Sequence, residues 1–304
     1  VLDIYGDVTI TNGTIEMTGA ASGSAIWINN GAKVTIDNSV KVSATGSVNN
    51  KTSFAIAFDS SCDGAALTFN GAIAGENGVT INGNITKNTN KISVNGTIAV
   101  TELALYLAGN GTTDINNGAS LKGDVGVEIR AGVLNINGGT ITSTGANYNV
   151  TSNPGGATTT GAALAVAEHT TNQGVTVNIN GGTITNVAGG KAISVANPEE
   201  KEEAKGANVS VNGGTISGDV KVGENVKSTV EGKEPLTVSA DYNMTKDPEG
   251  NYTIAKKPTS YYYYSPSTTT PDTTKGSPKT IDAGLALYVG MALPSAAGVA
   301  VVGK

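Results

Sequence analysis

One recurring phrase constrains this chain more than any other feature. It reads apolar, any residue, apolar, Asn, Gly, Gly, Thr, Ile, and it occurs at 134–141, 177–184 and 209–216. The alternation on either side of the glycines is typical of half-buried β-strands. The glycine pair permits positive φ and therefore a sharp turn, and the Asn can bond its own backbone or stack on an Asn of a neighbouring repeat. Each phrase therefore predicts a strand, a corner and a second strand.

The spacing of the phrases favours one topology over another. Ile98, Ile141 and Ile184 follow one another at intervals of 43 residues. Hairpins in an antiparallel sandwich are the alternative, but they would not by themselves give a matched interval, whereas two solenoid coils of roughly 21 residues would. We expect an all-β fold, a right-handed parallel β-helix over residues 1–255. Roughly twelve coils at ~4.8 Å each would make a rod of about 55–60 Å.

The repeat pattern is interrupted at several places. The segment Val230–Ile254 breaks it and is expected to cap the C-terminal end, whereas no cap is visible at Val1, so we expect an upstream coil to be missing. Residues 143–160 are polar and Gly-rich, and residues 197–206 carry four Glu and two Lys. Both are expected to be insertions, either plain solvated loops or loops that carry binding.

Composition narrows the function classes. The chain has 304 residues, of which 41 are Gly and only 14% are charged, with a net charge of −6. Arg130 is the sole arginine, which argues against nucleic-acid binding, because phosphate contacts need clustered Lys and Arg. Cys62 is the sole cysteine, so no disulfide framework is expected. The N-terminus shows no signal peptide, and we expect one to have been removed or never included.

The C-terminal part has a different composition from the repeats. Residues 256–276 are rich in Thr, Ser, Pro and Tyr, including Tyr261–Tyr264, and predict a disordered linker. Residues 283–303 are uncharged and long enough to cross a bilayer as a hydrophobic helix, and Lys304 follows them.

Between the linker and the apolar stretch stand Ser277, Pro278, Lys279 and Thr280. The order of linker, four-residue motif, apolar segment and basic end resembles the cell-wall sorting signal of Gram-positive surface proteins. In that family a sortase cuts after the Thr of an LPxTG-type motif and joins it to peptidoglycan, and variants with Ser at the first position occur. Ile281 stands where the family has Gly. The resemblance implies peptidoglycan as a partner and the cell wall as location; a plain C-terminal membrane anchor is the alternative.

The body of the chain carries a second resemblance. Over most of 1–255, the phrases SAIWINNGAKVTI and INGGTI resemble those of pectate-lyase-like β-helices in surface proteins of gut Firmicutes. That family is described as adhesive or carbohydrate-binding. The resemblance implies the fold and suggests an extracellular binding role, toward glycans or host matrix.

Parallel β-helices also host polysaccharide lyases and hydrolases. A lyase needs a base, and Arg130 with Glu128 two residues away would share one face of a strand. An exposed ion pair is the simpler interpretation of these two residues. Asp59 and Asp63 could hold Ca²⁺ but fit a polar corner better, and His169 has no Cys or second His to complete a metal site. We therefore expect no catalytic residues, no metal and no cofactor.

Aromatic side chains offer a binding site instead. Trp27 is the only tryptophan, and alternation with Ile26 and Ile28 places it on the outer face, where it could contact a glycan or pack under a loop. Cys62, beside an apolar run, is expected to be partly buried. The sequence thus predicts a non-enzymatic, adhesin-like surface protein. The alternatives are a lyase or hydrolase and a purely structural stalk.

Overall fold

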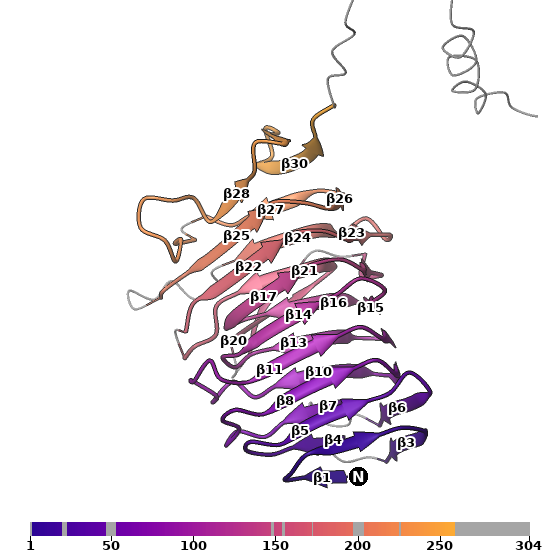
Figure 1. Ribbon diagram of the computed structural model, residues 1–304. Helices are drawn as coiled ribbons and strands as arrows, with labels where there is room; N and C mark the ends of the chain where they lie inside the picture. Colours follow the sequence, from indigo (N-terminus) through magenta and orange to yellow (C-terminus); the bar gives the residue numbers. More distant parts are fainter. Residues whose placement is uncertain are drawn as a thin grey trace, which may run out of the picture. The chain divides into compact units, whose positions relative to one another are not determined.

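The computed structural model describes residues 2–19, 23–46, 53–146, 149–153, 156–171, 173–196, 204–224 and 226–258. Over these residues the chain coils repeatedly through three parallel β-sheets, so that each strand pairs with the equivalent strand of the next coil (Figure 1). This arrangement confirms the predicted right-handed parallel β-helix and excludes the antiparallel sandwich. The predicted sorting motif Ser277–Thr280 and the apolar stretch 283–303 lie outside the described residues.

The first sheet has eleven strands. In spatial order they are β1 (Leu2–Ile4), β4 (Ser24–Ile28), β7 (Phe54–Phe58), β10 (Asn77–Ile81), β13 (Leu103–Leu107), β16 (Val125–Ile129), β21 (Ala162–Ala167), β24 (Lys191–Ala196), β27 (Val220–Val222), β30 (Asn251–Lys256) and β29 (Tyr242–Lys246).

The second sheet has nine strands and the third has eight. Those of the second are β2 (Val8–Ile10), β5 (Lys33–Ile36), β8 (Ala66–Phe69), β11 (Lys91–Val94), β14 (Thr112–Ile115), β17 (Gly132–Ile136), β22 (Val175–Ile179), β25 (Ala207–Val211) and β28 (Leu236–Val238). Those of the third are β3 (Gly13–Thr18), β6 (Val40–Thr45), β9 (Ala72–Gly75), β12 (Thr97–Val100), β15 (Ser120–Gly123), β18 (Thr140–Ser143), β23 (Thr183–Asn186) and β26 (Thr215–Ser217).

Each coil takes one strand from each sheet. The described residues therefore form eight complete coils, and β27 with β28 begins a ninth. The predicted twelve coils and 55–60 Å were wrong: at ~4.8 Å per coil, the eight spacings extend about 38 Å. The coils are fewer because most of them are longer than the assumed 21 residues.

The two 43-residue intervals have different structural origins. Ile98 pairs with Leu121, which pairs with Ile141, so the first interval holds two coils, as predicted. Ile141 pairs directly with Ile184, so the second interval is a single coil enlarged by an insertion. That insertion contains an antiparallel hairpin of β19 (Asn149–Asn153) and β20 (Gly156–Thr160). The equal spacing is therefore a coincidence of one insertion with one extra coil.

The core is a continuous apolar column inside the coils. On the second and third sheets alternate residues point inward, as alternation predicts. On the first sheet two consecutive residues point inward, and the earlier of the two is small. A Cβ added at Gly126, for example, would lie 2.4 Å from Cγ2 of Ile141 on the third sheet. Equivalent positions in the other coils also hold Gly or Ala; they are Ala25, Ala55, Gly78, Ala104, Ala163 and Ala192.

The corner between the second and third sheets, here the second corner, carries the Asn of the repeated phrase. Side-chain amides stack from coil to coil, each Nδ2 donating to the Oδ1 of the Asn in the preceding coil at 2.8–3.4 Å. The asparagine ladder consists of Asn70, Asn95, Asn116, Asn137, Asn180 and Asn212. Of the two roles expected for this Asn, stacking between coils is the one observed.

The C-terminal end of the helix is closed by antiparallel strands. β29 and β30 form a hairpin, and β30 pairs antiparallel with β27. Tyr242 and Ile254 of this hairpin are buried, and the Tyr242 hydroxyl donates a 2.7 Å hydrogen bond to the carbonyl of Gly214. Because an antiparallel strand ends the parallel stacking, the segment Val230–Ile254 is the predicted cap.

Candidate functional site

The outer face of the first sheet carries a row of residues in register, one from each coil. Trp27 pairs with Ala57, Ala57 with Thr80, Thr80 with Tyr106, and Tyr106 with Glu128. Ile26 and Ile28, on either side of Trp27, are fully buried in the core, whereas Trp27 is half-buried. The predicted outward orientation of Trp27 is thus observed.

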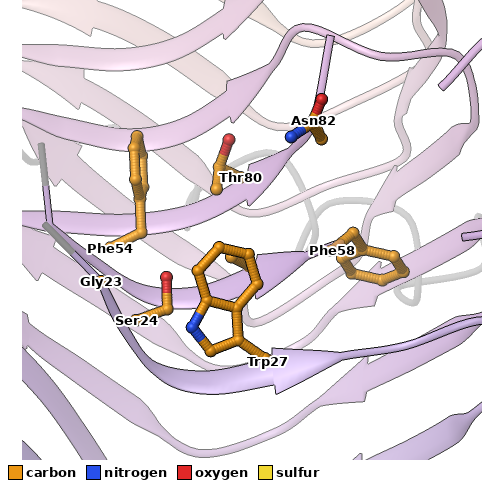
Figure 2. A pocket seen from close by; sticks show the side chains of 8 residues that line it. Gly23, Ser24, Trp27, Phe54, Phe58, Thr80 and Asn82 are labelled. Atoms are coloured by element: carbon orange, nitrogen blue, oxygen red, sulfur yellow. The ribbon is translucent and has the colours of Figure 1, made fainter. Parts of the chain in front are cut away.

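A hollow of about 180 Å³ opens beside Trp27 (Figure 2). Thr80 lies between Phe54 and Asn82 in this view, and Trp27 and Phe54 stand at the edge of the hollow (Figure 2). Ala57, which pairs with both Trp27 and Thr80, also lines the hollow, and its short side chain leaves space above the strand. Phe54 stacks on Tyr106, with ring centroids 6.2 Å apart and planes at 21°. The hollow is lined by Gly23, Ser24, Trp27, Phe54, Ala57, Phe58, Thr80 and Asn82.

The chemistry of this hollow is aromatic and uncharged. None of its lining residues is ionisable, and Ser24, Thr80 and Asn82 supply the side-chain hydroxyls and amide. Trp27 and Tyr106 stand three coil spacings apart along the row, about 14 Å at ~4.8 Å per coil. Flat rings with a few polar groups between them suit a neutral ligand that has one apolar and one polar face.

Glu128 and Arg130 form an ion pair, but it is buried rather than exposed as predicted. Both side chains have 0% exposure, and Nε of Arg130 lies 3.9 Å from Oε1 of Glu128. The guanidinium also donates to the Tyr106 hydroxyl at 3.1 Å and to the carbonyls of Ala167 and Glu168 at 3.2 and 3.4 Å. The inserted strand β20 contacts β16 and β21, the neighbouring strands of the sheet that carries the pair.

This burial has two chemical consequences. Arg130 has no surface that a polysaccharide could reach, and its guanidinium is occupied by hydrogen bonds to Tyr106, Ala167 and Glu168. Burial also raises the pKa of the Tyr106 hydroxyl, an effect opposed by the charge of Arg130 and reinforced by that of Glu128. The cluster therefore ties three successive coils together, through Tyr106 of β13, Arg130 after β16, and Ala167 and Glu168 at the end of β21.

Asp59 and Asp63 do not converge on a shared site. The Asp59 carboxylate accepts hydrogen bonds from the backbone N–H and the hydroxyl of Ser61, which lower its pKa. Asp63 instead bonds Lys87 and Thr89 of the next coil, and these bonds lower the pKa of its carboxyl. Each aspartate thus fixes a turn, in agreement with the polar-corner interpretation.

Cys62 lies between these two aspartates and is buried, as expected. Its thiol donates to the carbonyl of Ile28 at 2.9 Å, and burial raises the pKa of Cys62 to about 11, with the charge of Asp59 adding to the effect. A thiol of this kind stays protonated and is a poor nucleophile at neutral pH.

His169 and its neighbour Glu168 lie at the corner between the first and second sheets, here the first corner. Nδ1 of His169 is 3.0 Å from the Thr171 hydroxyl, and the ring lies where a side chain at Gly83 would be. The Glu168 carboxylate accepts the backbone N–H groups of Gly174, Lys205 and Gly206 at 2.8, 3.1 and 2.8 Å. In the part of the chain that the structure describes, no three His, Cys, Asp or Glu side chains gather as a metal site.

The structural role of Glu168 escaped the sequence analysis. A Glu-His pair in a loop carries no signal that a corner 37 and 38 residues later will donate to the Glu, because that contact depends on the length of the coil between them. Among the described residues no helix is long and apolar enough to cross a membrane. Tyr261–Tyr264 of the linker lie outside those residues.

Comparison with known proteins adds no relative: no family model, no curated protein and no solved structure matches this chain. The fold is therefore established by the stacking of its own strands, and the site by its own side chains.

Proposed function

We propose that this chain is a non-enzymatic, adhesin-like protein of the cell surface that binds neutral glycans through the hollow beside Trp27. The observation that carries the proposal is the aromatic, uncharged hollow beside Trp27, into which the largely buried Phe54 also faces. The C–H face of a pyranose packs on an aromatic ring, and its hydroxyls need a few well-placed polar partners. Ser24, Thr80 and Asn82 are such partners.

The geometry also suits a ligand that runs along the helix axis. The backbones of Trp27 and Tyr106 lie about 14 Å apart along the row, since three spacings of ~4.8 Å separate them, and the Phe54 ring stacks on Tyr106 at one end of this length. Only the small Ala57 and the hydroxyl of Thr80 lie on the row between the two rings. A chain of two or three sugar units could lie there with its rings against the aromatic side chains.

Surface display is the second part of the proposal and rests on sequence. The linker, the motif Ser277–Thr280, the apolar stretch 283–303 and Lys304 follow the order of a cell-wall sorting signal. We propose that sortase joins Thr280 to peptidoglycan and that the linker carries the β-helix outward. Replacing Thr280 with Ala should then move the protein from the peptidoglycan fraction to the membrane fraction. Unchanged fractionation would contradict wall attachment.

A polysaccharide lyase has less support from the described residues. The only arginine is wholly buried and bonded to Tyr106 and two carbonyls, which leaves it unsuited to remove a substrate proton. The sequence offered Arg130 as its best candidate base, so the binding function is the one proposed.

Glycan binding is tested with the full chain on an array of plant, mucin and bacterial glycans. Trp27→Ala should weaken the strongest signals at least tenfold, because loss of one stacking contact worth ~1.4 kcal/mol gives that factor. Tyr5→Ala is the matched control, since Tyr5 is an exposed aromatic of the first coil that lies outside the hollow. A flat array, or equal effects of the two substitutions, would overturn the proposal.

A further inference from the structure

A second hollow, of about 390 Å³, lies along the first corner and the adjoining face of the second sheet. Its size falls within the ~300–1,000 Å³ usual for small-ligand sites. Unlike the hollow at Trp27 it has no aromatic side chain. It is lined by Asn88, Asn110, Gly132, Val133, Gln173, Gly174, Thr176, Lys205 and Thr229, which come from six successive coils.

We call this second space the polar hollow. Each of its three side-chain amides makes one hydrogen bond to the protein, through either its nitrogen or its oxygen. Nδ2 of Asn110 donates to the carbonyl of Thr86 at 3.0 Å, and Nε2 of Gln173 donates to the carbonyl of Thr171 at 2.8 Å. Oδ1 of Asn88 accepts from the Thr112 hydroxyl at 3.3 Å. These bonds fix the orientation of the amides. Within the described part of the chain, the Asn110 and Gln173 oxygens and the Asn88 amino group are left for a ligand.

The floor of the polar hollow is held open by glycine. Gly174 has φ +74, and a Cβ there would lie 3.3 Å from Cβ of Lys205 and 3.4 Å from Cγ2 of Thr229, two residues that line the space. The backbones of Gly174 and Lys205 are fixed by the buried Glu168 carboxylate, which accepts an N–H from each. Glu168 therefore holds the floor of the polar hollow in a fixed shape before any ligand binds.

The mixture of groups selects the class of ligand. Two amide oxygens accept, one amide and the Lys205 ammonium donate, and the hydroxyls of Thr176 and Thr229 do both. Such a set matches vicinal hydroxyls, each of which donates and accepts. An anion would meet two acceptor oxygens and the negative charge of Glu168 beneath the floor, with Lys205 the only cation among the lining residues.

We infer that the polar hollow is a second saccharide site, which binds a neutral oligosaccharide through its hydroxyls rather than through its ring faces. It is independent of the hollow at Trp27, because the two share no lining residue. The chain would then hold glycans at two places on its surface, by two different chemistries.

The experiment measures binding of neutral hexasaccharides of glucose, mannose and galactose to the full chain by calorimetry. All variants also carry Trp27→Ala, so that binding at the hollow beside Trp27 does not contribute to the signal. At least one hexasaccharide should bind. Thr176→Tyr, which fills the polar hollow, should weaken this binding at least tenfold, and Gln173→Ala should weaken it by a smaller factor without added bulk. Thr183→Tyr is the matched control, from the same coil but on the third sheet.

Several results would overturn the inference. The Trp27→Ala protein could bind none of the three probes, or Thr176→Tyr and Thr183→Tyr could bind them equally well. Tighter binding of hexagalacturonate than of the neutral probes, lost on Thr176→Tyr, would show that the site prefers acidic sugars. Failure here would leave the Trp27 proposal intact, because that proposal is judged by the difference between the unsubstituted chain and Trp27→Ala.

Discussion

The first and second corners of each coil perform the same task, turning the chain from one sheet to the next, by opposite means. The second corner has two to four residues in every described coil from Asp37 onward and carries the asparagine ladder. The first corner varies from two residues, at Arg130 and Ala131, to thirteen, at 223–235. It carries Asp63 with Lys87, Glu168 with its backbone partners, and the polar hollow.

The difference teaches which part of a repeat protein builds the rod and which part builds a site. A corner that stays short and repeats its Asn keeps neighbouring coils in register, because each Asn of the ladder bonds the one before it. A corner that varies brings different side chains onto one edge of the stack, and binding groups are commonly found on such loops. If this division holds, the two corners should respond differently to equivalent substitutions.

The largest effect is expected at the first corner. It would show that this corner, although its length varies from coil to coil, is held firmly in place. Glu168→Ala removes a carboxylate that accepts three backbone N–H groups, two of them on buried glycines. Leaving these donors without an acceptor should lower the free energy of unfolding by about 3–5 kcal/mol. Thermal unfolding measures the loss, with the exposed Glu231→Ala as control. Equal midpoints for the two variants would mean that Glu168 is not an anchor.

An intermediate effect should separate the two corners directly. Gly182 of the second corner has φ +81, and a Cβ there would lie 2.7 Å from the carbonyl oxygens of Gly138 and Gly139. Gly64 of the first corner has φ +74 with open space around it. Gly182→Ala should therefore cost about 2–4 kcal/mol, from backbone strain and the clash, and Gly64→Ala about 1 kcal/mol, from strain alone. Similar losses in urea unfolding would remove the distinction.

The smallest effect tests the ladder itself. Asn95 donates to Asn70 at 2.8 Å and accepts from Asn116 at 2.9 Å. Asn95→Ala should cost about 1–2 kcal/mol, because two net hydrogen bonds are lost in a partly solvated position. Asn84→Ala, at an exposed position of the first corner, should stay within ~0.5 kcal/mol of the unsubstituted protein. A ladder that contributes nothing would leave both variants equally stable.

Repetition also decided how much could be predicted from sequence. The repeated strand–corner–strand phrase predicted the parallel β-helix and named stacking as one of two roles for its Asn, and alternation within a single strand predicted the outward orientation of Trp27. The coil count failed because the interval from Ile141 to Ile184 matched the preceding one by coincidence. Neither interval alone reveals how many coils it holds.

The two hollows were less accessible to sequence analysis. That at Trp27 depends on the register that places Ala57 and Thr80 between two aromatic residues. The polar hollow gathers residues from Asn88 to Thr229, and Arg130 bonds carbonyls that come 37 and 38 residues later in the chain. Such arrangements follow from the lengths of several coils at once. A short-range sequence pattern does not reveal the combined length of several coils, which decides which residues meet.

The insertion between β18 and β21 also has a consequence for how such a chain can change over time. Ile141 and Ile184 keep the same pairing as shorter coils although a whole hairpin separates them. The entropic cost of a longer connection grows slowly, by about 0.6 kcal/mol for each doubling of its length. New segments can therefore be inserted between the third and the first sheet without changing how the strands of neighbouring coils pair. The fold is in this sense a scaffold whose inserted loops can be exchanged. An engineered peptide placed between Ser143 and Ala162 would be presented at the surface, while the strands of the adjacent coils keep their pairing.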